Sequence, residues 1–296
     1  MKGEPDFLEN LRNEMGGGRQ WLDRAIVITF AVLAGLAVVG FTLLADTAFE
    51  WFDALRSAAW WAPLLWTPAV TALVVWAVRR WAPAAAGSGV PQVMSALAPE
   101  VPATSRGRFV SLRISVGKVL GVSGGLLAGL SIGRQGPSVQ VAAGVMHHAR
   151  RWFGPHSGIS HHALLVAGGA AGIAAAFNAP LAGVVFAIEE LSRKLESRSS
   201  GLIIAAIVLA GLMGVSAFGN LSYFGRIQVP HLTWDALLPG LCVTLACGVL
   251  GGLFAKLLAA SLTRAPERLN QLRARFPIRF AAAVALVIAV IGLVTG

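Results

Sequence analysis

Charged residues are scarce in this 296-residue chain. Only 13% of the residues are Asp, Glu, Lys or Arg, whereas a soluble domain carries about a quarter. Hydrophobic residues make up 56%, and the mean hydropathy is +0.69. These values exclude a disordered chain, a coiled coil, a collagen-like chain and a secreted disulfide scaffold. They favour one all-α integral membrane bundle over the two soluble domains that the length alone would suggest.

Cysteine is also rare. The two cysteines, Cys242 and Cys247, lie five residues apart in an apolar run, so they indicate neither a disulfide framework nor a metal site. We expect both to be small buried residues. The paired histidines His147-His148 and His161-His162 could suggest a metal site, but no carboxylate or cysteine accompanies them. The sequence therefore favours histidines at the membrane interface, with no metal and no organic cofactor.

Acidic residues are fewer than basic ones, 14 against 24, which gives a net charge of +10. The basic residues cluster between apolar runs, which is typical of cytoplasmic anchoring at a membrane. No basic patch interleaved with aromatic residues indicates a nucleic-acid partner. The first 24 residues are polar and resemble no signal peptide. We therefore predict a cytoplasmic segment over 1–24 and a multi-pass domain over 25–296, in a bacterial inner membrane.

Several apolar runs are long enough to cross a bilayer, for which about 20 residues are needed. The runs are Ala25 to Ala45, Ala58 to Val78, Leu112 to Ile132, Ala163 to Ile188, Gly201 to Phe218, Leu237 to Ala260 and Phe280 to Val294. The fourth run is interrupted at Asn178-Ala179-Pro180, and Ser138 to His147 is too short to cross. Clusters of Gly and Ala at 121–125 and 168–172 predict close helix packing.

Three segments place small or polar residues before a proline, after which an apolar helix resumes. They are Gly87-Ser88-Gly89-Val90-Pro91, Gly133-Arg134-Gln135-Gly136-Pro137 and Phe177-Asn178-Ala179-Pro180. Proline fits the first turn of a helix, so each segment predicts a helix that begins inside the hydrophobic region. The start of a helix exposes unpaired N–H groups and the positive end of the helix dipole. Several such starts that converge would bind a small anion without a full opposite charge.

These three segments, together with Phe186-Ala187-Ile188-Glu189-Glu190 and with Lys118 ahead of the second segment, resemble the CLC family of chloride channels and transporters. The resemblance runs from about Ala25 to the C-terminus. It implies a homodimer with one anion pathway in each subunit, and two inverted halves of tilted and broken helices. The chain resembles the first inverted half plus the start of the second.

The resemblance also assigns roles to individual residues. It implies that Ser88, with Gly89 beside it, binds the central anion, and that the amides of Arg134, Gln135 and Gly136 line an outer site. The residue at the middle of the second motif is the external gate, here Gln135. Glu190 best matches the inner proton-passing glutamate, with Glu189 beside it. No residue is expected to be catalytic, because this resemblance implies a transporter and not an enzyme.

Two departures from the family pattern decide the expected mechanism. Gln135 has the shape of glutamate but no titratable carboxyl, so we expect passive, uncoupled movement of chloride or a similar small anion. The third anion-binding motif and the pore tyrosine of the family are not found, since the only tyrosine is Tyr223. The sequence is therefore expected to be truncated.

Two other functions are considered. A truncated chain could be a non-conducting membrane subunit or a fragment of a longer chloride transporter. Gly121-Val122-Ser123-Gly124 has the form of an intramembrane serine protease nucleophile, but that chemistry needs a histidine base within hydrogen-bond reach. The histidines lie mostly at loop edges, so Ser123 is expected to be a packing residue.

Overall fold

The computed structural model describes residues 18–154, 157–192, 200–219, 234–263 and 266–295. Most of the 1–24 segment and Tyr223 lie outside the described residues. Every regular element in the described ranges is a helix, which confirms the all-α prediction. The α-helices are α2 (Gly18–Ala58), α3 (Pro63–Trp81), α4 (Val90–Leu97), α5 (Leu112–Leu127), α6 (Gln135–Ala149), α7 (His161–Ala176), α8 (Pro180–Phe186), α9 (Ser200–Phe218), α10 (Leu237–Thr263), α11 (Glu267–Arg275) and α12 (Pro277–Thr295).

Shorter helical turns join these elements. The 3₁₀ turns are η1 (Pro83–Ala85), η2 (Arg106–Arg108), η3 (Arg150–Trp152) and η5 (Trp234–Ala236), while η4 (Ala187–Leu191) is a π-helical turn. Each predicted interruption before a proline separates two elements: α4, α6 and α8 begin within two residues of Pro91, Pro137 and Pro180. The three predicted helix starts are therefore confirmed.

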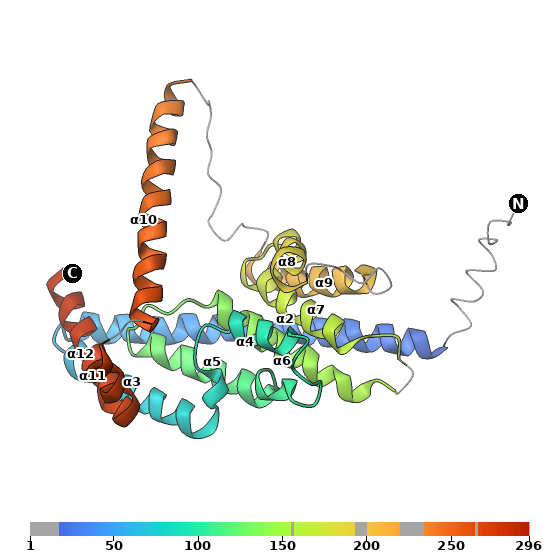
Figure 1. The fold of residues 1–296 in the computed structure, drawn as a ribbon, viewed down its shortest axis with the longest axis horizontal. Coiled ribbons are helices and arrows are strands. Elements are labelled where there is room, and N and C mark those ends of the chain that lie inside the picture. The colour runs from blue at the N-terminus through green and yellow to red at the C-terminus, as the bar shows by residue number, and fades with distance from the viewer. Residues whose placement is uncertain (1–17, 155–156, 193–199, 220–233, 264–265, 296) are drawn as a thin grey trace, which may run out of the picture.

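Five of the helical segments in the described ranges are long and apolar enough to cross a membrane. They are Gly18–Ala58, Arg106–Leu127, Gly201–Phe218, Leu237–Ser261 and Pro277–Thr295. The predicted run from Ala58 also forms a helix, α3, but it is not among the five, because its last turn carries Arg79 and Arg80. Helix α2 is far longer than the predicted run that ends at Ala45 and forms the long axis of the molecule (Figure 1). The chain is thus a multi-pass membrane protein.

Helix α7 is the centre of the bundle and packs against α6, α9, α2 and α8. Twelve of its residues are buried, and nearly all are Ala, Gly, Leu or Val. A Cβ added at Gly168 would lie 2.8 Å from the Cα of Ala143, and one at Gly172 would lie 2.7 Å from the Cα of Val139. Only glycine lets α6 and α7 approach so closely, which confirms the packing prediction for this cluster.

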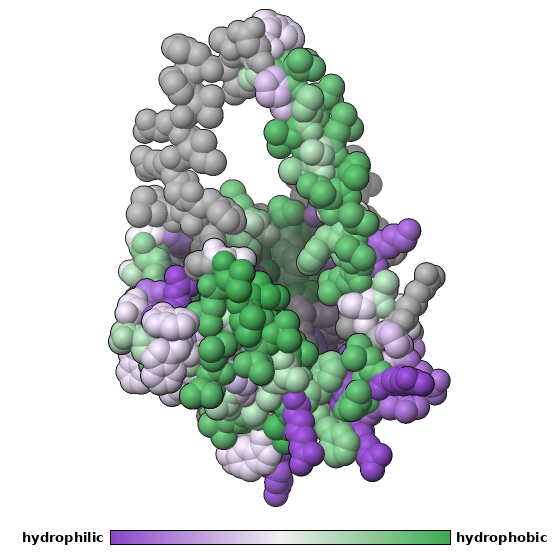
Figure 2. All heavy atoms as spheres, turned by 90° about the vertical axis from the view of Figure 1, so that its left-hand side faces the viewer, coloured by the Kyte–Doolittle hydropathy of each residue, from purple (hydrophilic) through white to green (hydrophobic). Residues whose placement is uncertain are grey.

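Helix α10 differs from the rest, because almost all of its described residues are exposed. It stands apart from the bundle in Figure 1, and its surface in Figure 2 is largely hydrophobic. Cys242 and Cys247 lie on this helix and are exposed. The expectation that both are buried was therefore wrong, since an apolar run does not specify which neighbour covers it.

Candidate functional site

The loop before α4 is held by the side chain of Gln92. Its Oε1 accepts a hydrogen bond of 2.8 Å from the N–H of Gly89, and its Nε2 donates one of 2.7 Å to the carbonyl of Ala86. Gly87 and Gly89 have φ angles of 86° and 116°, a region that only glycine enters readily. The loop therefore presents the exposed Ser88 between two glycines. The amide of Gly89, a predicted anion ligand, is already engaged by Gln92.

Lys118 supports the same loop from α5. Its ammonium donates a hydrogen bond of 2.8 Å to the carbonyl of Gly87, and the residue is only 1% exposed. Within the described part of the chain, Lys118 has no carboxylate partner. A buried cation without an opposite charge is costly, and an anion bound nearby would compensate it.

The second helix start, at α6, leaves two donors unused. The amide of Ser138 bonds back to the carbonyl of Arg134, and Pro137 has no N–H. In the described ranges, the N–H groups of Gln135 and Gly136 have no acceptor. These two amides are the first donors of a 15-residue helix, so they lie at the positive end of its dipole.

The first two helix starts lie against each other. A Cβ at Gly136 would lie 2.7 Å from the hydroxyl oxygen of Ser88, and one at Gly89 would overlap the carbonyl of Gly136. Any larger residue at either position would push the two loops apart. The structure thus brings Ser88, Gly89 and Gly136 together, although they lie nearly 50 residues apart in the chain.

Gln135 lies at a cavity of about 280 Å³ between α2 and the start of α6. The other lining residues are Ala45, Asp46, Phe49, Leu126, Ile132, Gly133 and Arg134. A Cβ at Gly133 would lie 3.4 Å from Oε1 of Gln135, so the amide side chain is folded back over this loop. The cavity leaves open space beside Gln135, the predicted gate.

The side chain of Arg134 reaches α2 at the wall of the same cavity. Its guanidinium forms an ion pair with Asp46 and donates a hydrogen bond of 3.4 Å to the carbonyl of Thr42. The pair neutralises a positive charge beside the cavity and fixes the residue that precedes the free amides. Asp46 and Gln92 were not predicted from the sequence. Gln92 could have been found, because it occupies the third position of α4, where a glutamine side chain returns to the capping residue.

The third helix start lies in the break between α7 and α8. Asn178 has a φ of 55°, and its Nδ2 donates a hydrogen bond of 2.6 Å to the carbonyl of Gly219 at the end of α9. The π-helical turn η4 follows, and it carries Glu189 and Glu190. Both glutamates are exposed, while the next residue, Leu191, packs against Gly169 of α7. Within the described residues, no hydrogen bond or ion pair joins either glutamate to Ser88 or Gln135.

The paired histidines and Ser123 were the other candidate sites in the sequence. His147 and His161 share a hydrogen bond of 2.7 Å between Nδ1 and Nε2, and in the part of the chain that is described no third ligand completes a metal site there. The hydroxyl of Ser123 is buried, and the described residues offer it no hydrogen-bond partner. None of the histidines in the described ranges therefore reaches Ser123 as a base.

Comparison with known proteins identifies the family. The family model for the voltage gated chloride channel matches residues 70–296. The chain belongs to this family. It is 31% identical over 245 residues to the H(+)/Cl(-) exchange transporter ClcA of Vibrio vulnificus (strain YJ016), covering 78% of this chain and 50% of that protein. It is 33% identical over 247 residues to ClcA of Citrobacter koseri, covering 76% of this chain and 50% of that protein.

Membership of the chloride channel family confirms the resemblance drawn from the three helix starts. The chain spans about half the length of the curated relatives that it matches. The family match also covers the loops that hold Ser88 and Gln135.

Proposed function

We propose that this chain forms part of a transmembrane pathway for chloride or a similar small anion. The observation that carries the proposal is the meeting of two helix starts. The free amides of Gln135 and Gly136 lie beside the hydroxyl of Ser88, and the buried Lys118 lies behind the same loop. Backbone and hydroxyl donors can hold an anion while it still exchanges rapidly, which a cage of charged side chains would prevent.

The proposed ligands differ in what they contribute. Ser88 supplies a neutral donor. A serine at this position favours chloride over nitrate and fluoride, because the resemblance associates those anions with family members that carry other residues here. Gln135 and Gly136 supply the amides of the outer site. The carbonyl of Arg134 accepts a hydrogen bond from the hydroxyl of Ser138, and this bond fixes the orientation of the two amides. Gly89 contributes shape and not a donor, because its N–H is bonded to Gln92.

Anion movement through this pathway is proposed to be passive. Gln135 occupies the place of the gate, and an amide cannot accept and release a proton in the physiological range. Glu190, with Glu189 beside it, is the candidate for an inner proton step. The outer proton step has no titratable group, because Gln135 is an amide. The relatives are exchangers by name, and this chain is proposed to lack their proton coupling.

A flux experiment tests the proposal directly. The 296-residue chain is reconstituted into liposomes loaded with chloride, and external chloride and pH are recorded together. We expect chloride to leave down its gradient when a potassium ionophore removes the voltage, without uphill proton movement. Stoichiometric proton transport against its gradient would contradict the passive mechanism and would assign the carboxylate's role to another residue.

The surroundings of the pathway are proposed from the same resemblance. The chain would lie in the bacterial inner membrane with residues 1–24 in the cytoplasm and 25–296 in the lipid bilayer. It would assemble as a homodimer, with chloride as its small-molecule partner and no nucleic acid. Cross-linking in membranes, followed by measurement of the covalent mass, tests the dimer.

A second candidate is a non-conducting subunit or a fragment of a longer chloride transporter. The observation that favours it is the exposure of nearly all described residues of α10, a helix whose residues are mostly apolar. Absence of chloride flux from liposomes that demonstrably contain folded protein would support this candidate. A serine protease at Ser123 would require labelling by a fluorophosphonate that is lost in Ser123→Ala.

A further inference from the structure

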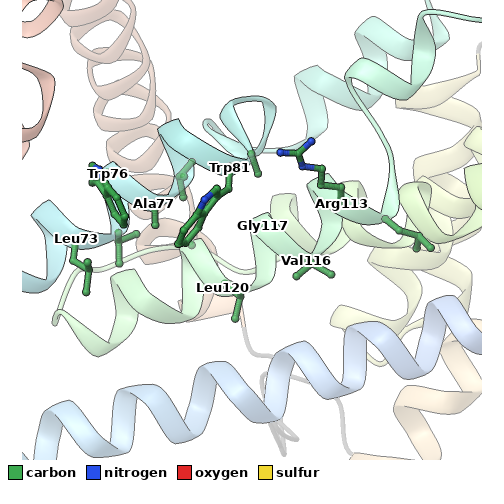
Figure 3. Close-up of a pocket in the computed structure, with 13 residues that line it drawn as sticks. Leu73, Trp76, Ala77, Trp81, Arg113, Val116, Gly117 and Leu120 are labelled. Atoms are coloured by element: carbon green, nitrogen blue, oxygen red, sulfur yellow. The ribbon is translucent and has the colours of Figure 1, made fainter.

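A second concave surface lies away from the two helix starts, between α3 and α5. The groove has a volume of about 750 Å³, and its lining is almost entirely apolar. Figure 3 shows Leu73 and Trp76 toward one end, Trp81 in the middle and Arg113 at the other end. The rings of Trp76 and Trp81 pack edge to face, with centroids 5.4 Å apart. Nothing in the proposed anion pathway uses this groove.

Glycines build the floor of the groove. Helices α3 and α5 run antiparallel, so that Gly117 meets Ala82, Gly121 meets Val78 and Gly124 meets Val74. A Cβ at Gly121 would lie 3.0 Å from Val78, and one at Gly124 would lie 2.7 Å from Val74. Because α5 presents glycines to the small side chains of α3 along this line, the two helices lie close together and the larger side chains on either side form the walls of a trough. The cluster at 121–125 thus packs as predicted.

The walls of the groove are exposed hydrophobic side chains. Leu73 is 59% exposed, Val116 is 58% exposed and Leu120 is 62% exposed. The α5 wall belongs to one of the five segments that can cross a membrane. Exposed aliphatic side chains on a spanning helix are stable when lipid tails surround them, so this trough has the chemistry to hold an acyl chain.

Arg113 is the one charged residue among those that line the groove. It is the second residue of α5, two positions after the capping residue Ser111. Among the described residues, no hydrogen-bond or ion-pair partner reaches its guanidinium. Arginine matches the oxygens of a phosphate in a two-pronged geometry, and the adjoining helix start also favours negative charge.

We propose that the groove between α3 and α5 is a binding site for an anionic phospholipid. The phosphate lies against Arg113, and one acyl chain extends past Trp81 and Trp76 toward Leu73. The charge of Arg113 argues for a lipid with net negative charge over a zwitterionic one. Basic pockets between membrane helices hold such headgroups elsewhere. An apolar helix from a second copy of the chain would cover the trough but leave the Arg113 charge without an opposite charge.

Native mass spectrometry of the detergent-purified 296-residue chain tests this site. The protein is incubated with phosphatidylglycerol or with phosphatidylcholine of the same acyl chains, and the retained lipid is counted. We expect preferential retention of phosphatidylglycerol, reduced about tenfold in Arg113→Gln, because a charge-assisted hydrogen bond to phosphate is lost. Val116→Trp fills the trough without changing charge, and it should reduce retention of both lipids.

The matched control is Arg108→Gln, which removes the same charge from an exposed residue that does not line the groove. We expect this variant to retain phosphatidylglycerol like the unmodified chain. Equal losses in Arg108→Gln and Arg113→Gln would overturn the proposal, because they would indicate attraction to net charge alone. Retention unchanged in both Arg113→Gln and Val116→Trp would also overturn it. A dimer that Val116→Trp dissociates would assign the groove to a second copy instead. None of these readouts depends on anion transport.

Discussion

Ser88 is one neutral hydroxyl donor beside two free backbone amides, and this setting determines how much it can contribute. Replacing Ser88 by Ala should weaken chloride binding severalfold, because one neutral hydrogen bond contributes about 1 kcal/mol net. The fold should be retained, since Ser88 is exposed and its loop is held by Gln92 and Lys118. Isothermal titration calorimetry with chloride measures the change.

The control for Ser88 is Ser95→Ala on α4, the helix that follows the Ser88 loop. The hydroxyl of Ser95 bonds to the carbonyl of Pro91 within α4, away from the α6 amides. This variant should bind chloride like the unmodified chain. Identical chloride affinity in Ser88→Ala would remove Ser88 from the set of anion ligands.

The residues of the site were predicted unevenly, for a physical reason. The two loops were located from the motifs Gly-Ser-Gly and Gly-Arg-Gln-Gly, because glycine and proline constrain the backbone locally. Partners from distant elements are set by tertiary packing, so the ion pair of Arg134 with Asp46 was not foreseen. Gly89 was counted among the anion ligands, although its amide is engaged by the side chain of Gln92 three residues further on, a local capping contact that the sequence could have indicated.

At the scale of the elements, glycines set the distance between helices. Gly172→Ala should lower the stability of the bundle by about 1–3 kcal/mol, because overpacking a tight interface costs that much. Its added Cβ would lie 2.7 Å from the Cα of Val139 on α6, where backbone atoms cannot move aside. Thermal unfolding in detergent, followed by circular dichroism, measures the loss.

Gly251→Ala on α10 is the matched control for Gly172→Ala. A Cβ at Gly251 would meet no heavy atom within 4 Å, and alanine favours a helix interior over glycine. The control should therefore unfold at the same temperature or slightly higher. Equal unfolding temperatures for Gly172→Ala and the unmodified chain would contradict the close packing of α6 and α7.

The hydrogen bond between His147, near the end of α6, and His161, at the start of α7, should depend on pH. Burial lowers the pKa of His161 to about 4, with His147, Arg106 and Arg150 adding to the effect. Burial also lowers the pKa of His147, together with the charges of His148, Arg151 and Arg106. Both histidines lie outside the five candidate spans. Because an unfolded histidine binds its proton near pH 6.5, the unfolded state holds more protons between about pH 6.5 and pH 4.

Stability should therefore fall as the pH is lowered through this window and be fully present above pH 6.5. His161→Gln should reduce this dependence, since glutamine does not titrate but can still form a hydrogen bond with His147. Unfolding temperatures at pH 7.5 and pH 5 measure the slope. His148→Gln, outside the hydrogen bond between the two rings, should keep most of the slope. An equal slope in His161→Gln would indicate that other groups cause the acid sensitivity.

The helices themselves were largely predictable. Apolar runs and prolines located most of the elements, because hydropathy and local backbone constraints act within a single segment. The boundaries were less accurate: α5 ends at Leu127, while the apolar run continues to Ile132. A loop with apolar residues is indistinguishable from a helix by hydropathy, and here Gly129, with a φ of 81°, lies in the break.

At the scale of the whole molecule, the arrangement of the two facing helix starts decides which chemistry is possible. Coupled exchange needs one group that accepts a proton and also occupies the place of the anion. A partly buried carboxylate has that capacity, whereas the amide of Gln135 does not ionise. The cavity beside Gln135 is about 280 Å³, so a carboxylate of the same shape has room to move there.

Gln135→Glu should therefore make chloride flux dependent on external pH near neutrality, whereas flux through the unmodified chain should change little. Below the pKa of the new carboxyl the side chain is neutral and resembles Gln135, so flux should approach that of the unmodified chain. Above that pKa the carboxylate competes with chloride for the free amides, so flux should fall as the pH rises. Chloride efflux from liposomes between pH 5 and pH 8 measures the profile. Gln271→Glu is the control, because Gln271 is an exposed glutamine on α11 that does not line the cavity. The same pH profile in both variants would mean that Gln135 does not occupy the gate.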